Sequence, residues 1–407
     1  MTERMKVLVV SYHAPPVLNA ESILVWKTIR ALSRDFQVQL LTSSVDGSRR
    51  LDDDMALPTQ VEVIRRNVFH LRNPFLAKVV SRGMGLAVDE AFLFARKTRK
   101  TFLDKLSGDV IYSRSHPGAS HILAYRIKRQ TGKPWIAQFS DPWSANPYHE
   151  GHTHFRKRFD RRWERRVIEH ADSLVFPTKE ILAMYVDAYP HVCVAEKAFV
   201  IPHHYTPELY RPRAATTAPT DTDVVTFGYF GDFYGARSPK PLIDAVCEVQ
   251  RKRPEWTGRI RIRLVGSLAP KYQAEVDRRE VRIDQSKASY FDSLIEMSET
   301  DVLVLIDAPS KSGVNPFLAS KLMDYLGAGR PILGITDSLG TAAEILRGCG
   351  HTVVSPYETS RIASAVEKLI LERPVVSAPA AYATESVVGE LARVLRNRGE
   401  SSRLNES

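Results

Sequence analysis

A lysine and an aspartate stand three residues apart at the start of a predicted helix, and both are suited to bind parts of a nucleotide. Lys321 and Asp324 belong to the segment SKLMDYLGAGRPIL, residues 320–333, which follows a strand and its loop. A cation in the first turn of a helix is unfavourable unless an anion meets it, and a carboxylate can accept hydrogen bonds from the two hydroxyls of a ribose. The pair predicts half of a nucleotide site. The alternative is an intrahelical ion pair worth about 0.2–0.5 kcal/mol.

A second candidate for anion binding lies in GYFGDFYGARSPKPLIDAV, residues 228–246. Here a predicted strand runs into a loop with glycines, and Arg237 and Lys240 follow just before a helix. Glycines permit close approach of the backbone, and the two cations could hold a diphosphate. The alternative is an ordinary turn with solvated cations.

Polar side chains also follow three predicted strands of the first half. Asn19 follows the first strand and could supply a side-chain donor, and His116 follows a later one. Asp141 lies just past the strand 135–140, where an acid could orient or deprotonate a hydroxyl group. Capping of the next segment is the alternative for Asp141.

These residues need a scaffold of buried parallel strands, and the sequence predicts two of them. The predicted strands are apolar almost throughout, as in a parallel sheet that is covered on both faces, and they lie at 6–12, 38–42, 109–113, 135–140, 173–178, 223–231, 259–267, 301–307, 331–336 and 352–357. Amphipathic helical patterns alternate with them, at 22–34, 118–133, 241–253 and 291–299. This order indicates an α/β protein with two doubly wound domains, in which ligands bind beyond the carboxyl ends of the strands.

Length and composition agree with this organisation. The chain has 407 residues, too long for one core, and 43% of them are hydrophobic. Residues 201–223, rich in Pro, Thr and Ala, are predicted as a linker. The three cysteines are far apart, which excludes a disulfide framework and a zinc site. With no signal peptide and no apolar run long enough to span a bilayer, we predict a cytoplasmic protein.

The net charge is +10, and much of the excess lies in the first half. Such a charge suits phosphorylated substrates, an anionic membrane or nucleic acid. Residues 73–106 alternate apolar and cationic side chains and predict either a peripheral position on the inner face of the membrane or a solvated helix face. Residues 155–166 predict an exposed helix with Phe159 and Trp163 packed inward. No recognised nucleic-acid motif is present.

The segments described above resemble those of GT-B glycosyltransferases of the family 4 type. SKLMDYLGAGRPIL is similar to the donor-binding signature S-K-L-x-E-Y-L-x-x-G-x-P-I, and residues 228–246 resemble the phosphate loop of the family. ERRVIEHADSLVFPT, residues 164–178, and KAFVIPHHYTPELYRP, residues 197–212, resemble its helix–strand and hinge segments. These four segments occur in the right order, and the resemblance covers nearly the whole chain.

The resemblance implies two Rossmann-like domains that face a cleft. Residues 1–205 would form the acceptor-side domain, with a C-terminal helix within 386–407 packed back on it, and residues 206–385 the donor-binding domain. The sequence departs from the family at Pro316, where many relatives carry a glutamate, and at Asp324, which replaces a second glutamate.

Site roles carried over from the family fall on both domains. In the donor domain Lys321, Arg237 and Lys240 would meet the diphosphate, Asp324 the ribose, and Leu322 the base or ribose through its backbone. In the first domain Asn19 stands where relatives have a glycine pair, His116 would contact the transferred sugar, and Asp141 would act on the acceptor hydroxyl.

The resulting prediction is a metal-independent glycosyltransferase that needs no cofactor and uses a nucleotide-diphosphate sugar, with retention, in cell-surface polysaccharide or glycoconjugate synthesis. The acceptor would be a sugar, a lipid-linked glycan or a small molecule. A nucleotide-sugar 2-epimerase of the same fold is the nearest alternative, and a basic nucleic-acid-binding protein is the more distant one.

Overall fold

The computed structural model describes most of the chain, and the chain divides into two compact units. The described residues are 4–45, 51–67, 91–146, 149–210, 224–233, 235–277, 280–308 and 314–406, together with Val79, Gly83, Met84, Leu86 and Val88. The first unit comprises residues 1–203 and 384–407, and the second comprises residues 204–383.

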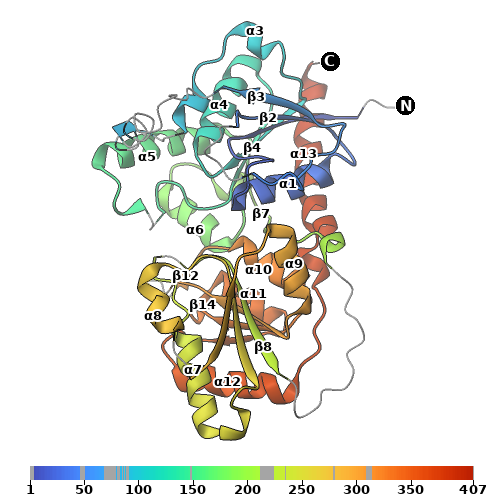
Figure 1. The fold of residues 1–407 in the computed structure, drawn as a ribbon. Coiled ribbons are helices and arrows are strands. Elements are labelled where there is room, and N and C mark those ends of the chain that lie inside the picture. The colour runs from blue at the N-terminus through green and yellow to red at the C-terminus, as the bar shows by residue number, and fades with distance from the viewer. Residues whose placement is uncertain are drawn as a thin grey trace. The chain divides into compact units, whose positions relative to one another are not determined.

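The first unit is built on a sheet of seven parallel strands (Figure 1). In sheet order these are β3 (Glu62–Arg66), β2 (Gln37–Ser43), β1 (Lys6–Ser11), β4 (Val110–Ser115), β5 (Trp135–Phe139), β6 (Ser173–Phe176) and β7 (Ala198–Val200). Its helices are α1 (Ala20–Leu32), α3 (Lys100–Leu103), α4 (Ala119–Thr131), α5 (His154–His170), α6 (Lys179–Ala188) and α13 (Thr384–Glu406).

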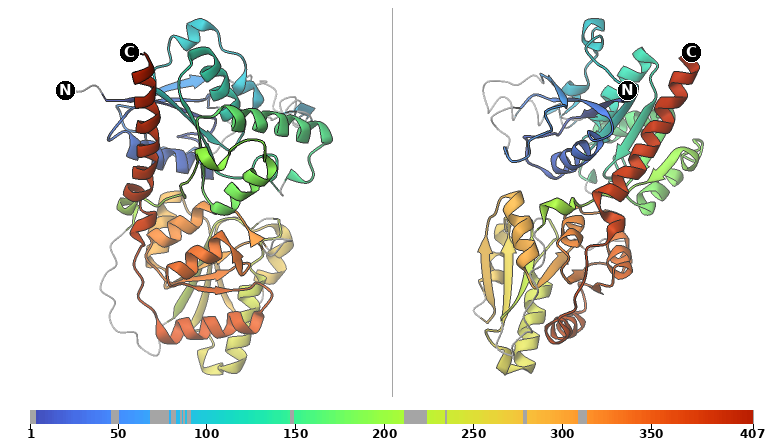
Figure 2. Two further views of the ribbon diagram at one scale, coloured as in Figure 1. Left: turned by 180° about the vertical axis from the view of Figure 1, so that it is seen from behind. Right: turned by 90° about the vertical axis from the view of Figure 1, so that its right-hand side faces the viewer.

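Helices cover both faces of this first sheet. Alternate residues of β1 point to opposite faces, so Val7 and Val9 pack with α1 and α13, while Leu8 and Val10 pack with α4 and α5. The two views of Figure 2 show α13, the last helix of the chain, running along the first unit. The last segment of the sequence thus completes the core that the first segment begins.

The second unit repeats the plan with a sheet of six parallel strands. In sheet order these are β10 (Arg282–Ser286), β9 (Ile260–Val265), β8 (Val225–Phe230), β11 (Val302–Ile306), β13 (Ile332–Ile335) and β15 (Thr352–Val354). A two-stranded pair, β12 (Val314–Asn315) and β14 (Leu339–Gly340), lies outside the sheet. The helices are α7 (Lys240–Lys252), α8 (Gln273–Val276), α9 (Tyr290–Glu299), α10 (Ser320–Gly327), α11 (Thr341–Gly348) and α12 (Thr359–Glu372).

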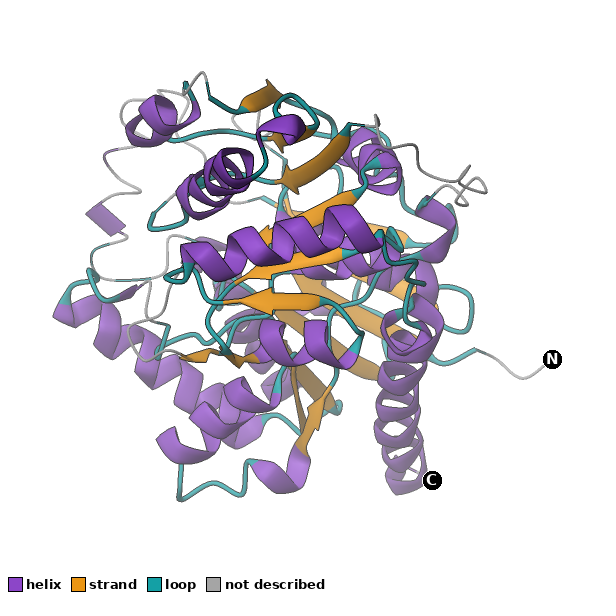
Figure 3. Ribbon diagram, turned by 90° about the horizontal axis from the view of Figure 1, so that it is seen from below, coloured by secondary structure: helices purple, strands orange, loops and turns teal. Residues whose placement is uncertain are grey.

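The second sheet also lies between two helical layers; Figure 3, coloured by secondary structure, shows strands and helices layered in this way. Residues Val302, Val304 and Ile306 of β11 pack with α7 and α12, whereas Leu303 and Leu305 pack with α9, α10 and α11. Each strand therefore has two buried faces, which explains its nearly continuous apolar sequence.

The predicted parallel α/β architecture is confirmed, and the errors fall at the sheet edges. Three edge strands of the two sheets were not predicted, β3, β7 and β10. The sequences of β3 and β10, EVIRR and RIDQS, are charged, and because both strands are partly exposed, charged side chains are tolerated there. The strand β7 has only three residues, and they belong to the segment that was compared with the hinge of the family. Phe159 and Trp163 pack against the core as predicted.

Two predicted segments are described only in part. In the predicted linker 201–223, residues 201–210 are described and 211–223 are not. Tyr205 is buried and pairs with Ala383 in a bridge, so the start of this linker is packed. Of the basic segment 73–106, residues 91–106 are described together with Val79, Gly83, Met84, Leu86 and Val88, and the rest lies outside the described residues.

Candidate functional site

Both sheets have the same strand order, and it places a switch point in each unit. When only the strands of each sheet are counted along the chain, both orders begin 3-2-1-4-5-6, so neighbouring connections run to opposite sides between β1 and β4 and between β8 and β11. In open parallel sheets, ligands bind beyond the carboxyl ends of the strands at such a point. The residues that follow β1, β4, β8 and β11 are therefore the candidates.

In the second unit, Lys321 lies in the first turn of α10. Its Nζ donates a hydrogen bond to the Tyr229 hydroxyl at 2.8 Å and lies 4.3 Å from the centre of the Tyr229 ring. Tyr229 is near the end of β8, so the lysine is aimed at the switch point of this sheet. No side-chain cap is found at the α10 N-terminus among the described residues. Its first backbone N–H groups and the lysine together form a positive centre.

Charges of both signs surround this lysine. Burial, followed by the neighbouring Arg237, lowers the pKa of Lys321 to about 7, although Asp307 and Asp232 act in the opposite direction. Arg237 Nη2 lies 3.7 Å from Asp307 Oδ1. Burial raises the pKa of Asp307, against the effect of Arg237 and Lys321. Two cations thus converge here, as the sequence predicted for Lys321 and Arg237, and an anion would relieve their repulsion.

A glycine shapes the surface beside the lysine. Gly231 has φ of 132°, and a Cβ at this position would lie 2.4 Å from Lys321 Nζ. Any larger residue would therefore be strained in its backbone and would displace the ammonium group. The glycine-rich loop predicted from the sequence thus has an identified purpose at Gly231, which is to leave room for the lysine.

Asp324 lies one turn further along α10 and is buried. Its Oδ1 accepts hydrogen bonds from the hydroxyls of Tyr210 at 3.1 Å and Tyr290 at 3.2 Å. The carboxylate that was predicted to meet ribose is therefore held by two tyrosines from distant segments. Leu322 is fully buried in the core, and its backbone N–H donates to the Ala319 carbonyl oxygen at 2.9 Å.

Lys240 is located differently from Lys321 and Arg237. It opens α7, and its Nζ pairs with Asp244 on the same helix. About half of its side chain is exposed. Lys321 contacts Tyr229 and Arg237 contacts Asp307, whereas the ion pair of Lys240 lies within its own helix.

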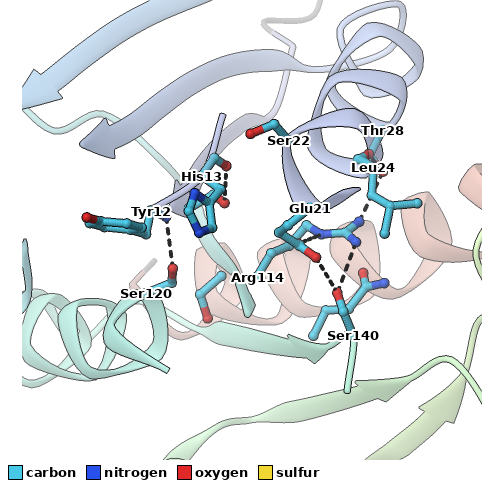
Figure 4. A network of polar contacts seen from close by, with 12 residues as sticks. Tyr12, His13, Glu21, Ser22, Leu24, Thr28, Arg114, Ser120 and Ser140 are labelled. Atoms are coloured by element: carbon cyan, nitrogen blue, oxygen red, sulfur yellow. Dashed lines mark hydrogen bonds and ion pairs between the residues drawn. The ribbon is translucent and has the colours of Figure 1, made fainter. Parts of the chain in front are cut away.

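In the first unit, the switch point is filled by a buried ion pair (Figure 4). Arg114, at the end of β4, donates from Nε to Glu21 Oε1 at 2.9 Å, and Ser140 donates to Glu21 Oε2 at 2.7 Å. Arg114 also reaches Thr28 on α1 at 3.2 Å. Burial raises the pKa of Glu21, against the effect of Arg114. The network ties β4, β5 and α1 together.

Asn19 closes the N-terminus of α1. Its Oδ1 accepts a hydrogen bond from the Ser22 backbone N–H at 2.9 Å, and its Nδ2 lies 3.0 Å from His13 Nδ1. A backbone N–H group in the first turn of α1 is therefore already capped by the Asn19 side chain. The predicted role of Asn19 as a side-chain donor would use Nδ2, and so it would compete with the contact to His13 while the cap through Oδ1 is kept.

The two predicted catalytic residues follow β4 and β5. Burial, followed by the charge of Glu21, raises the pKa of Asp141 to about 6. Burial, followed by neighbouring His149 and His13, lowers the pKa of His116 to about 4. At neutral pH Asp141 is therefore largely ionised and His116 is neutral. The His116 and His149 rings lie 5.6 Å apart.

Sequence reasoning did not assign roles to Tyr229, Glu21, Arg114, Tyr210 or Tyr290. Arg114 did give a signal, because an arginine within the buried strand sequence VIYSRS needs a buried acid as its partner. Glu21 precedes the predicted helix 22–34 and gave no signal of its own. The tyrosines gave no signal of their own, because tyrosine is common in cores.

Among the described residues, metal-ligand clusters and membrane-spanning helices are both absent. No group of three or more His, Cys, Asp or Glu side chains is placed there to hold a metal ion. Within the same part of the chain, no helix is long and apolar enough to cross a membrane.

Comparison with known proteins finds a family match in the first unit and a likeness of fold over both units. Residues 24–203 match the family described as "Glycosyl transferase 4-like domain". No curated protein sequence matches the chain. Among solved structures, HepE from Anabaena in complex with UDP has a TM-score of 0.63 and 14% sequence identity, covering 97% of this chain and 100% of that chain.

Two further structures show the same likeness over nearly the whole chain. Sucrose-phosphate synthase from Thermosynechococcus elongatus has a TM-score of 0.62 and 15% identity, covering 98% of this chain and 94% of that chain. The lipopolysaccharide outer core galactosyltransferase WaaB in its apo form has a TM-score of 0.58 and 12% identity, covering 99% of this chain and 100% of that chain. At these identities the likeness shows the fold, and the predicted GT-B fold class is confirmed.

Proposed function

We propose that the protein is a glycosyltransferase of the GT-B type, which transfers a sugar from a UDP-sugar to an acceptor hydroxyl. The match of residues 24–203 to a glycosyl transferase 4-like domain and the GT-B fold of the whole chain support this proposal. UDP is chosen because HepE was solved with UDP and with UDP-glucose. Transfer with retention, in the synthesis of cell-surface polysaccharide or glycoconjugate, follows from the resemblance to family 4 and is part of the proposal.

The observation that carries the proposal is the half-buried Lys321 in the first turn of α10, with Arg237 close enough to act on it. When the glycosidic bond to the donor breaks, negative charge develops on the diphosphate. Preorganised cations and helix N–H groups stabilise such charge more effectively in a site of low dielectric than in water. We assign Lys321 and Arg237 to the diphosphate and include in the proposal that they act without a metal ion.

The proposal also assigns roles to the other residues that the sequence predicted. In the second unit, Asp324 is assigned to the ribose, Leu322 contributes through its backbone, and Lys240 gives long-range attraction to the diphosphate. In the first unit, Asp141 orients or deprotonates the acceptor hydroxyl, since a group with a pKa of about 6 is a usable base at neutral pH.

His116 completes the first-unit assignment. Because it is neutral at working pH, it donates or accepts a hydrogen bond to the transferred sugar rather than supplying charge. Asn19 follows β1, the parallel neighbour of β4, and is assigned a weaker contact, since its Nδ2 already contacts His13.

The acceptor and the cellular location belong to the same proposal. We place the enzyme in the cytoplasm and, through the basic segment 73–106, on an anionic membrane surface. The acceptor classes that agree with this are sugars, lipid-linked glycans and small molecules.

The proposal is tested by a thermal-shift screen of the purified protein against UDP, ADP and GDP and their glucose and galactose derivatives. We expect UDP and a UDP-sugar to raise the melting temperature, since a ligand that binds only the folded state stabilises it. UMP serves as the matched control, because it lacks the second phosphate. A protein that responds to no nucleoside diphosphate would contradict the assignment. Release of UDP with an epimerised sugar and no acceptor would indicate the 2-epimerase instead.

A further inference from the structure

Tyr229 contacts Lys321 in two ways at once. The Tyr229 hydroxyl accepts a hydrogen bond from Nζ at 2.8 Å, and the face of its ring lies 4.3 Å from the same nitrogen. The hydroxyl also donates to the Asp232 carbonyl oxygen at 3.3 Å. A ring face and a hydroxyl oxygen both attract an ammonium group. Tyr229 therefore offers the lysine a defined position.

The tyrosine itself is held firmly. It is completely buried in β8, and its ring stacks on that of Phe233 with centroids 4.0 Å apart. Gly231 leaves the space next to Nζ open, since a Cβ there would lie only 2.4 Å away. The amine thus lies between a rigid aromatic ring and a residue without a side chain.

The polar and charged groups around the amine come from β8, the loop that follows it and the end of β11. Tyr229 approaches from β8, Asp232 and Arg237 from the loop that follows it, and Asp307 from the end of β11. Burial, followed by Arg237, brings the pKa of Lys321 to about 7, so near neutral pH the amine is divided between its neutral and charged forms. The diphosphate of a bound donor would favour the charged form.

From this geometry we propose that Tyr229 is a positioning residue that holds the Lys321 amine at the diphosphate site, and that the amine takes up a proton as the donor binds. The inference rests on the proposed function, because it assumes that a nucleotide diphosphate binds beside Lys321. It gives a role to Tyr229, to which the sequence analysis assigned none, and it adds the uptake of a proton during donor binding.

The test is isothermal titration calorimetry of the full chain with UDP-glucose, in buffers of different ionisation enthalpy, at pH 6 and pH 8. The diphosphate of UDP-glucose has no group that titrates in this range, so proton uptake reports on the protein. For the parent protein we expect little uptake at pH 6 and about one proton per UDP-glucose at pH 8, because the free amine is mostly neutral above its pKa.

Tyr229→Phe keeps the ring and its stacking on Phe233 but removes the hydroxyl. We expect UDP-glucose to bind about tenfold more weakly at pH 8, the loss of one hydrogen bond to a charged group. The rise in proton uptake should also move to lower pH, because the charged amine has lost an acceptor. A purely structural role for Tyr229 would not move this pH profile.

The control is Tyr325→Phe, which removes another buried hydroxyl that contacts β8, through the Phe230 backbone at 2.7 Å. It should lower the melting temperature but leave the affinity and the proton uptake unchanged. Lys321→Arg is a second variant, since arginine stays protonated at both pH values. It should bind UDP-glucose without proton uptake.

The outcomes separate the two proposals. If the parent binds UDP-glucose and Tyr229→Phe has the same affinity and pH profile, the inference is wrong and the proposed function stands. Proton uptake that persists in Lys321→Arg would also overturn the inference, even if Tyr229→Phe failed to fold. A parent protein that binds none of UDP-, ADP- and GDP-glucose would overturn both.

Discussion

The switch points of the two units have the same topology and different electrostatic designs. At β1 and β4 the buried Arg114 is paired with Glu21, and Asn19 caps the helix that begins there. At β8 and β11 Arg237 lies 3.7 Å from Asp307, and burial, followed by Arg237, lowers the pKa of Lys321, although Asp307 and Asp232 act in the opposite direction. Among the described residues no side chain caps α10.

This difference separates stability from ligand binding. A buried ion pair whose partners satisfy each other holds the scaffold and leaves little attraction for a ligand. A partly buried lysine with a lowered pKa is held at a cost in folding free energy, which an anionic ligand can repay on binding. We therefore expect substitutions in the first network to change stability and substitutions in the second to change donor binding.

The largest expected effect is on stability, from Glu21→Ala. This change leaves the Arg114 guanidinium buried without its carboxylate, which typically destabilises a protein by about 3–5 kcal/mol. The melting temperature should fall by about 6 °C or more, measured by calorimetry. Glu385→Ala is the matched control, because Glu385 forms an exposed pair with Arg34, and it should have little effect. A normal melting temperature for Glu21→Ala would remove the contrast between the units.

Lys321→Met should reduce activity without reducing stability. Loss of one preorganised cation at the leaving group should lower kcat/KM for the UDP-sugar by about 10²–10³-fold, measured by UDP release. The melting temperature of the free protein should be unchanged or higher, since a lysine whose pKa is lowered by burial does not favour folding at neutral pH.

The control for this substitution is Lys252→Ala. Lys252 is an exposed lysine on α7 that pairs with Glu248, and its loss should leave turnover unchanged. Parental turnover in Lys321→Met would show that α10 does not hold the diphosphate.

A smaller effect concerns the pH dependence of turnover and involves Asp141. Its pKa is raised to about 6, so the carboxylate is present above this pH and is lost as the pH falls through it. If Asp141 acts as a base, kcat/KM should fall about tenfold per pH unit below 6. Asp141→Asn should show lower turnover, and its kcat/KM should not fall in this way below pH 6. If the fall persists in Asp141→Asn, it belongs to another group.

The sequence by itself determined the alternation of strands and helices, the parallel sheets and the position of Lys321 in the first turn of a helix after a strand. These features depend on local periodicity and on the loops between neighbouring elements, which the order of residues records directly. The edge strands β3 and β10 were not predicted, because a half-exposed strand need not be apolar.

Only the tertiary structure decided which side chains meet. Tyr229 and Lys321 are 92 residues apart in the sequence, Glu21 and Arg114 are 93, and Tyr210 and Asp324 are 114. Such pairs form because the packing of sheets and helices brings the ends of distant strands together, and no local pattern records that choice. For the same reason the sequence could indicate a lysine for phosphate, while its lowered pKa and its tyrosine partner emerge only in the folded unit.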